Sequence, residues 1–121
     1  MLKESYVAKL KTLPKNAIKL DVGYPSIFAP SDTILREFNE IKSMLMTKGI
    51  AEPEARKRAW KKTDFENRFR KEIESKPEVI DKLKEIKKLA EEKDVYLYCY
   101  CGKFPCHRFI LIDMIKNLEE Q

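Results

Sequence analysis

The chain has 121 residues, which is enough for one hydrophobic core, and we expect a single domain over residues 1–121. Hydrophobic residues make up 43% of the chain, which excludes a disordered polymer, and no apolar run approaches the roughly 18 residues of a membrane span. The net charge of +5 favours an anionic partner, such as a small anion, a nucleotide or a nucleic acid.

The sequence also indicates the cellular compartment and the kind of source organism. Its first residues, MLKESYVAKL, lack the uninterrupted apolar stretch of a signal peptide. We therefore expect a cytoplasmic protein with reduced thiols and no membrane partner. Charged residues reach 37%, against an average of about 25%, and lysine and glutamate dominate them. This bias is typical of thermophiles, and we take it as an indication of such a source.

The first half of the chain combines extended and helical patterns. Residues 5–10 (SYVAKL) and 16–23 (NAIKLDVG) fit short strands, the second with clear alternation of apolar side chains. A proline-containing loop follows, and Ser31 or Asp32 then caps a helix that Gly49 ends. Residues 53–62 (PEARKRAWKK) predict a basic helix.

The second half predicts two further helices, a strand and a last helix. Phe65, Phe69 and Ile73 share one helical face, and Pro77 suits the first turn of the next helix. The sequence DVYLYCY then fits a strand, CGKFP a turn, and CHRFILIDMIKNL a helix that is apolar almost all round. This order favours an α/β domain with a small, partly parallel sheet, and an α+β domain with an antiparallel sheet is the alternative.

All three cysteines and the only histidine lie in residues 99–107. Cys99 and Cys101 are two apart on the last strand, so we expect their sulfurs to face the same way. Cys106 and His107 open the last helix, next to the carboxyl end of the strand, where open α/β sheets bind ligands. A helix N-terminus lowers the pKa of a cysteine and attracts anions.

Several functions fit this cluster. Cys106 is a candidate nucleophile, with His107 as its base or orienter and Arg108 as an anion anchor. Lys103 adds a charge of the same sign. Alternatively, the four side chains bind zinc, although adjacent Cys-His ligands strain a tetrahedral site; they are Cys99, Cys101, Cys106 and His107. The stretch also fits a phosphate-binding loop with incidental cysteines, or cysteines that simply pack in the core.

The cysteine-ended strand followed by Cys-His-Arg at the start of an apolar helix resembles the family called domain of unknown function 488. SYVAKLKTLP, IKLDVGYP, FAPSDTILREF and DFENRFRKEI occur in the order typical of that family. The resemblance implies a Rossmann-like α/β domain without an established activity. It also implies that four residues form the motif: Cys99, Cys106, His107 and Arg108.

One position departs from that family, because Cys101 stands where it usually has an acidic residue. The resulting Cys-x-Cys resembles a second family, domain of unknown function 4326, which pairs Cys-Trp-Cys with a later Cys-His. This departure favours a metal or redox role for the cluster. With the resemblance, the expected fold is a small single-domain, Rossmann-like, three-layer α/β protein with a short, mostly parallel sheet and a C-terminal helix after the last strand.

Two further segments carry candidate residues. The loop after the second strand brings Asp21, Tyr24 and Ser26 toward the same site, where we expect them to bind the ligand. Residues 55–71 are strongly basic and predict a nucleic-acid surface, or else a solvated helix face whose aromatic side chains lie in the core. The candidate nucleic-acid contacts there are Arg56, Arg58, Trp60 and Lys61.

Our first hypothesis is a small enzyme that needs no cofactor and acts on an anionic, nucleotide-like substrate at Cys106, His107 and Arg108. The second is a nucleic-acid-binding module, and the third is a small zinc protein. A homodimer is plausible for a short chain whose last helix is so apolar.

Overall fold

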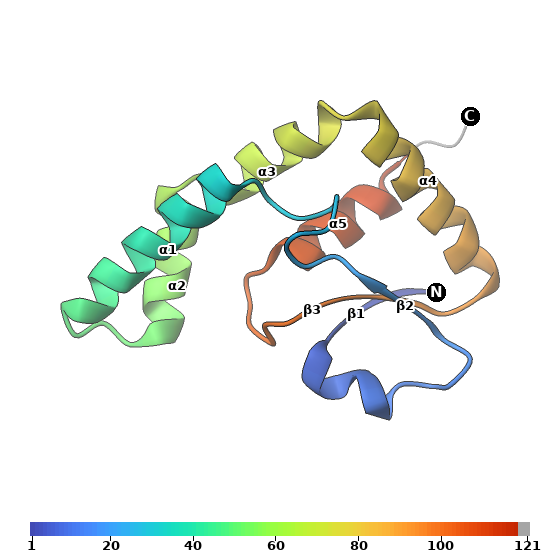
Figure 1. Ribbon diagram of the computed structural model, residues 1–121, viewed down its shortest axis with the longest axis horizontal. Coiled ribbons are helices and arrows are strands. Elements are labelled where there is room, and N and C mark those ends of the chain that lie inside the picture. The colour runs from blue at the N-terminus through green and yellow to red at the C-terminus, as the bar shows by residue number, and fades with distance from the viewer. Residues whose placement is uncertain (119–121) are drawn as a thin grey trace. The chain divides into compact units, whose positions relative to one another are not determined.

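The computed structural model describes residues 1–118, and Figure 1 shows its helices and strands. The elements are β1 (Leu2–Tyr6), the 3-10 helix η1 (Val7–Thr12), β2 (Ile18–Asp21), α1 (Asp32–Thr47), α2 (Glu52–Lys62), α3 (Phe65–Glu74), α4 (Pro77–Glu92), β3 (Val95–Cys99) and α5 (His107–Lys116). They form two compact units, one from residues 1–29 together with the chain from residue 73 onward, and one from residues 30–72. A single domain over residues 1–121 stays a prediction.

The first unit contains a sheet of three parallel strands in the order β1-β3-β2 (Figure 1). The central strand β3 is rich in β-forming residues, and its Val95 and Leu97 are fully buried. Parallel strands need long crossover connections, which the helices supply. The predicted small α/β fold with a short parallel sheet is therefore confirmed, and the antiparallel alternative is wrong.

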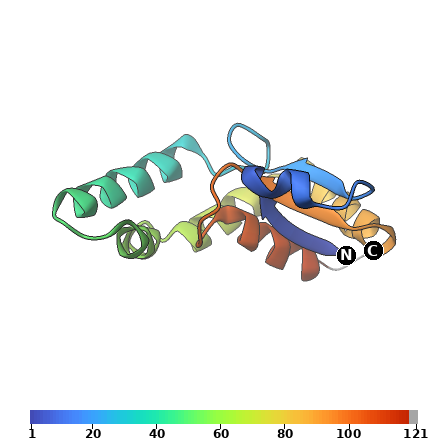
Figure 2. The same cartoon turned by 90° about the horizontal axis from the view of Figure 1, so that it is seen from below.

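Helix α5 follows β3 and contacts both β3 and β1 (Figure 2). Its burial agrees with its composition, since apolar residues such as Ile110, Leu111 and Ile115 are enclosed. The predicted C-terminal helix after the last strand is thus confirmed. No helix formed by residues 1–118 has the length and hydrophobicity needed to span a bilayer.

The second unit is helical, and its cap and its core both follow from the sequence. Ser31 is the N-cap of α1, where its Oγ accepts a hydrogen bond from the Ile34 N–H at 3.4 Å. Gly49 adopts φ +92°, which ends the α1 segment as predicted. An aromatic cluster fills the core, formed by Phe38, Trp60, Phe65 and Phe69.

The first strand differs from the prediction. It covers Leu2–Tyr6 rather than residues 5–10, and η1 begins at Val7. The reason is the register, because Tyr6 pairs with Cys99, the last residue of β3, and no β3 residue remains to pair with the chain beyond Tyr6.

Since β3 is the central strand, its buried side chains should dominate the stability of the sheet. We expect Leu97→Ala to lower the free energy of unfolding by about 2 to 5 kcal/mol, because it leaves a cavity. The control Val7→Ala, at an exposed position on η1, should change it by less than about 0.5 kcal/mol. Urea unfolding followed by circular dichroism measures both values, and equal losses would contradict this view of the core.

Candidate functional site

Three thiols meet at the carboxyl edge of the sheet. Cys99 ends β3, Cys101 follows in the loop, and Cys106 is the N-cap residue of α5. The Cys99 and Cys106 Sγ atoms are 3.3 Å apart, and the Cys101 Sγ lies 3.6 Å from the first and 3.7 Å from the second. All three are free cysteines. The predicted convergence of the sulfurs on one site is therefore confirmed.

The two inner thiols are buried, and their environment disfavours ionisation. Cys99 and Cys106 are each 4% exposed, whereas Cys101 is partly exposed. Hydrogen bonds with the Cys101 and Cys99 thiols, together with burial, raise the pKa of Cys106. The hydrogen bond with Cys101 likewise raises the pKa of Cys99, against an opposing bond with Cys106. The predicted lowering of the Cys106 pKa by the helix N-terminus is wrong, because neighbouring thiols and burial outweigh it.

His107 joins the cluster to the loop after β2. Its Nε2 lies 2.6 Å from the Val22 carbonyl oxygen, which can only accept, so Nε2 carries a proton. Its Nδ1 lies 3.6 Å from the Cys106 Sγ. The Val22 carbonyl therefore fixes the ring orientation and directs the other nitrogen at the Cys106 sulfur.

Arg108 is the most enclosed charged side chain of the site, at 2% exposure. Its Nε donates to the Glu4 carboxylate at 2.7 Å, and its Nη1 donates to the Cys99 Sγ at 3.1 Å and to the Cys101 carbonyl at 3.0 Å. Burial opposes the charge, but Glu4 and the nearby sulfurs raise the pKa of Arg108. The predicted anion anchor thus already holds three protein groups.

Two partners within the site, Glu4 and the Val22 carbonyl, were not among the residues predicted from the sequence. Glu4 lies on β1, opposite Leu97 in the register, and α5 brings Arg108 to it. The only available signal was a single acidic residue within the N-terminal strand. Every residue has a main-chain carbonyl, so the sequence does not indicate that the carbonyl of Val22 accepts the hydrogen bond from His107.

The loop after β2 approaches the cluster with its backbone at Gly23. A Cβ at Gly23 would lie 3.5 Å from the Cys99 Cβ. The Asp21 carboxylate accepts from the Gly23 N–H at 2.9 Å, and the Ser26 hydroxyl accepts from the Phe28 N–H at 3.2 Å. Both side chains therefore shape the loop, and Tyr24 is exposed. Ligand binding by Asp21, Tyr24 and Ser26 stays a prediction.

The loop from residue 100 to residue 105 links the cysteines and is largely exposed. Lys103 lies on it between Cys101 and Cys106 and is exposed. The neighbouring Phe104 is exposed and packs edge-on against Phe109, with 5.0 Å between the ring centroids. This loop therefore forms the solvent-facing side of the cysteine cluster.

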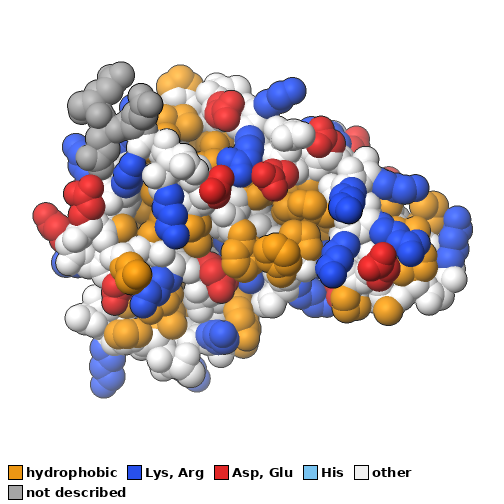
Figure 3. Space-filling model, turned by 180° about the vertical axis from the view of Figure 1, so that it is seen from behind, with side chains coloured by type: hydrophobic (Ala, Val, Ile, Leu, Met, Phe, Trp, Pro, Cys, Tyr) orange, Lys and Arg blue, Asp and Glu red, His pale blue; other side chains and the backbone are white. Residues whose placement is uncertain are grey.

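The basic segment is divided between core and surface. Arg56 is buried with its guanidinium over the Phe38 ring, and Trp60 stacks on Phe65 at 4.0 Å. Arg58 pairs with Glu54 at 3.0 Å, and Lys61 is exposed. Figure 3 shows acidic side chains scattered among basic ones over one face. Nucleic-acid binding stays a prediction, and Trp60, one of its candidate contacts, already stacks on a protein side chain.

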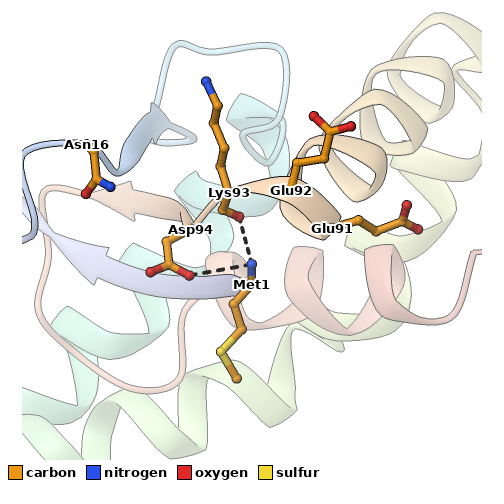
Figure 4. Close-up of a pocket in the computed structure, with 6 residues that line it drawn as sticks. All are labelled: Met1, Asn16, Glu91, Glu92, Lys93 and Asp94. Carbon is orange, nitrogen blue, oxygen red and sulfur yellow. Dashed lines mark hydrogen bonds and ion pairs between the residues drawn. The ribbon is translucent and has the colours of Figure 1, made fainter.

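A polar pocket of about 370 Å³ lies at the opposite, amino-terminal edge of the sheet (Figure 4). It is lined by Met1, Asn16, Glu91, Glu92, Lys93 and Asp94. The N-terminal ammonium donates to the Ala90 carbonyl and to the Lys93 carbonyl, and it pairs with Asp94 at 3.6 Å. These charges hold the chain end against the sheet, so the cysteine cluster is the better candidate for chemistry.

The cysteine cluster also has the composition of a metal site. Within residues 1–118, the ligand atoms found within 4.8 Å of one another are the sulfurs of Cys99, Cys101 and Cys106. His107 is not a member of this group, although its Nδ1 is close to one of the sulfurs. The cluster could therefore hold a metal through three protein ligands.

The chain matches the DUF488-N3a family, described as the active DUF488-N3 subclade, over residues 7–119, and it belongs to that family. The predicted membership of domain of unknown function 488 is confirmed, and the resemblance to domain of unknown function 4326 stays an expectation. No curated protein and no solved structure matches the chain. The cytoplasmic location, the thermophilic source and the homodimer stay predictions.

The ion pair between Arg108 and Glu4 should contribute measurably to stability, because its arginine is enclosed. We expect Glu4→Gln to lower the free energy of unfolding by about 2 kcal/mol, less than for a fully buried pair because Glu4 is partly exposed. Glu85→Gln removes an exposed partner of Lys82 and should cost less than about 0.5 kcal/mol. Chemical denaturation compares the two variants, and a neutral Glu4→Gln would contradict this role.

The raised pKa of Cys106 predicts slow alkylation of the metal-free chain. A thiol with a raised pKa stays protonated at pH 8, so Cys106 should react with iodoacetamide more slowly than Cys101 and than cysteines of the unfolded chain. Its rate should keep rising with pH beyond about 8.5, where a free thiol is half ionised. Mass spectrometry of timed digests measures each site. Fastest labelling at Cys106 near pH 7 would show an activated thiolate instead.

Proposed function

We propose that the cysteine cluster binds a zinc ion, which makes this family member a zinc-thiolate protein. The observation that carries the proposal is the spacing of the three sulfurs, from 3.3 to 3.7 Å. Tetrahedral zinc with bonds of 2.3 Å to sulfur places its ligand sulfurs about 3.8 Å apart. The three side chains thus need only small movements to surround an ion.

Charge supports the same proposal. The Arg108 guanidinium donates to the Cys99 Sγ at 3.1 Å, and a charged donor matches a thiolate better than a neutral thiol. Three thiolates around Zn²⁺ leave one negative charge, and the Arg108 guanidinium, which also pairs with Glu4, would attract it through the Cys99 sulfur. The raised pKa values of Cys99 and Cys106 describe the metal-free cluster, and a bound metal displaces the thiol protons.

The ligand chemistry selects the metal. Thiolates favour soft and borderline ions and discriminate against magnesium or calcium, which prefer oxygen ligands. Zinc is the ion most often held by cysteines of this kind in structural and catalytic sites. His107 lies beside the three sulfurs, with its Nδ1 3.6 Å from the Cys106 Sγ, and its Nε2–H donates to the Val22 carbonyl.

A second candidate function is a cysteine-dependent enzyme that acts on an anionic, nucleotide-like substrate without a metal. The alignment of the Cys106 Sγ, the His107 Nδ1 and the Val22 carbonyl favours it, because a nucleophile, a base and an orienting group occur in that order. The family description, which calls the subclade active, also supports it. In this enzyme Arg108 and Lys103 would attract the substrate anion.

One experiment separates the two candidates, namely metal content and thiol reactivity measured on the same sample, purified without added metal. The zinc proposal expects stoichiometric zinc, and alkylation of the partly exposed Cys101 that becomes faster after a chelator removes the metal. Cys99→Ser, Cys101→Ser and Cys106→Ser should each reduce the zinc content strongly, because each removes one ligand.

The control is the double variant Glu91→Gln, Asp94→Asn, which changes the polar pocket at the amino-terminal edge of the sheet. This variant should keep the zinc content of the wild type. Zinc lost in this control but retained in the three serine variants would place the ion away from the cysteines. A metal-free sample with rapid labelling of Cys106 would instead support the cysteine-dependent enzyme.

A further inference from the structure

We infer that the zinc centre has an open fourth coordination position and that a small thiol from outside the chain occupies it. This inference rests on the proposed zinc site and concerns what that site binds. It follows from three features of the cluster, namely the number of protein ligands, the side on which solvent reaches them, and their chemical type.

The protein supplies three ligands to the proposed zinc ion, the sulfurs of the cysteine cluster. In the described part of the chain, that group holds three sulfurs within 4.8 Å of one another, without a nitrogen of His107. A tetrahedral zinc site needs all four ligand atoms about 3.5 to 3.8 Å apart. The Val22 carbonyl holds the His107 ring by its Nε2 at 2.6 Å and so restrains it from turning toward the other sulfurs. Three protein ligands with a fourth position open is the pattern of catalytic zinc.

The open position has access to solvent. Protein covers Cys99 and Cys106, with Gly23 against the first and the Arg108 side chain beside it. Cys101 is partly exposed, and the residues that follow it are exposed as far as Phe104. A ligand can therefore reach the centre on the Cys101 side without rearrangement of the buried strand β3.

The chemical type of the ligand follows from softness and charge. A centre with three thiolates favours a soft fourth donor, and sulfur is softer than the oxygen of water. The chain has three cysteines in all, and all are already in the cluster, so a fourth thiolate comes from another molecule. Lys103 and the N-terminal end of α5 add positive potential that offsets the extra negative charge.

The binding step is a ligand exchange without a change in oxidation state. Water leaves zinc as the bond between zinc and the sulfur of the incoming thiol forms, and the thiol proton passes to solvent. A thiol bound to zinc is held as the thiolate at neutral pH. The centre would thus present an activated sulfur at a solvent-exposed edge of the sheet.

Cobalt(II) in place of zinc makes the inference testable, because bonds from sulfur to cobalt absorb in the near ultraviolet. The full-length chain, reduced with a phosphine and loaded with cobalt, is titrated with 2-mercaptoethanol. We expect a saturable rise of the charge-transfer band by about a third, as three sulfur bonds become four. Ethylene glycol, the matched ligand with oxygen in place of sulfur, should leave the band unchanged. His107→Gln, which can still donate to the Val22 carbonyl, should give the same titration.

The outcomes separate this inference from the zinc proposal. A normal cobalt band that 2-mercaptoethanol leaves unchanged overturns the open position and leaves the three-sulfur site standing. A change of the visible cobalt bands in His107→Gln assigns the fourth position to His107, with the same consequence. A cobalt sample without any charge-transfer band overturns both. If His107→Gln does not fold, the wild-type titration decides alone.

Discussion

The geometry of the site depends on the pairing of one buried charge, the guanidinium of Arg108. A guanidinium at 2% exposure is stable only when its charge and its N–H groups have partners, and Glu4, Cys99 and Cys101 accept hydrogen bonds from its Nε and Nη1. These partners come from β1, from the end of β3 and from the loop beyond it. Arg108 therefore ties the start of α5 to two neighbouring strands and fixes the loop that carries the sulfurs.

The parallel sheet supplies the second constraint. Because its strands run in one direction, the end of β3 and the loop after β2 meet at the same edge. That edge receives Cys99 from one strand and the backbone of Val22 and Gly23 from the other, while α5 begins there with Cys106. A short turn between β3 and α5 then suffices to bring the sulfurs together, so the small size of the chain does not prevent a compact site.

Contacts between residues that are close in the chain could be predicted from the sequence, whereas contacts between residues that are far apart in the chain could not. Cys99, Cys101 and Cys106 are close in the chain, so strand periodicity and the helix start were enough to predict that their sulfurs meet. The partner of Arg108 lies on β1, and the register that places it there depends on pairing with β3. The pKa of Cys106 was predicted in the wrong direction because the helix N-terminus is visible in a sequence, whereas the packing of other thiols around a sulfur is not. Trp60 shows the same limit, since its stacking on Phe65 follows from the fold of the helical unit.

The close packing of the three cysteine sulfurs affects whether the cluster favours a free thiolate or a bound metal. In the metal-free cluster, each ionised sulfur would sit within 3.7 Å of two other sulfurs, largely out of water, with one guanidinium as the nearby cation. A divalent ion at the centre removes that penalty for all three sulfurs at once, since it replaces their protons and attracts each thiolate. Arg108, which also pairs with Glu4, would then face the anionic centre instead of a single thiolate. The burial that disfavours a free Cys106 thiolate thus suits the proposed zinc-thiolate centre, and the partial exposure of Cys101 would leave that centre open to a ligand.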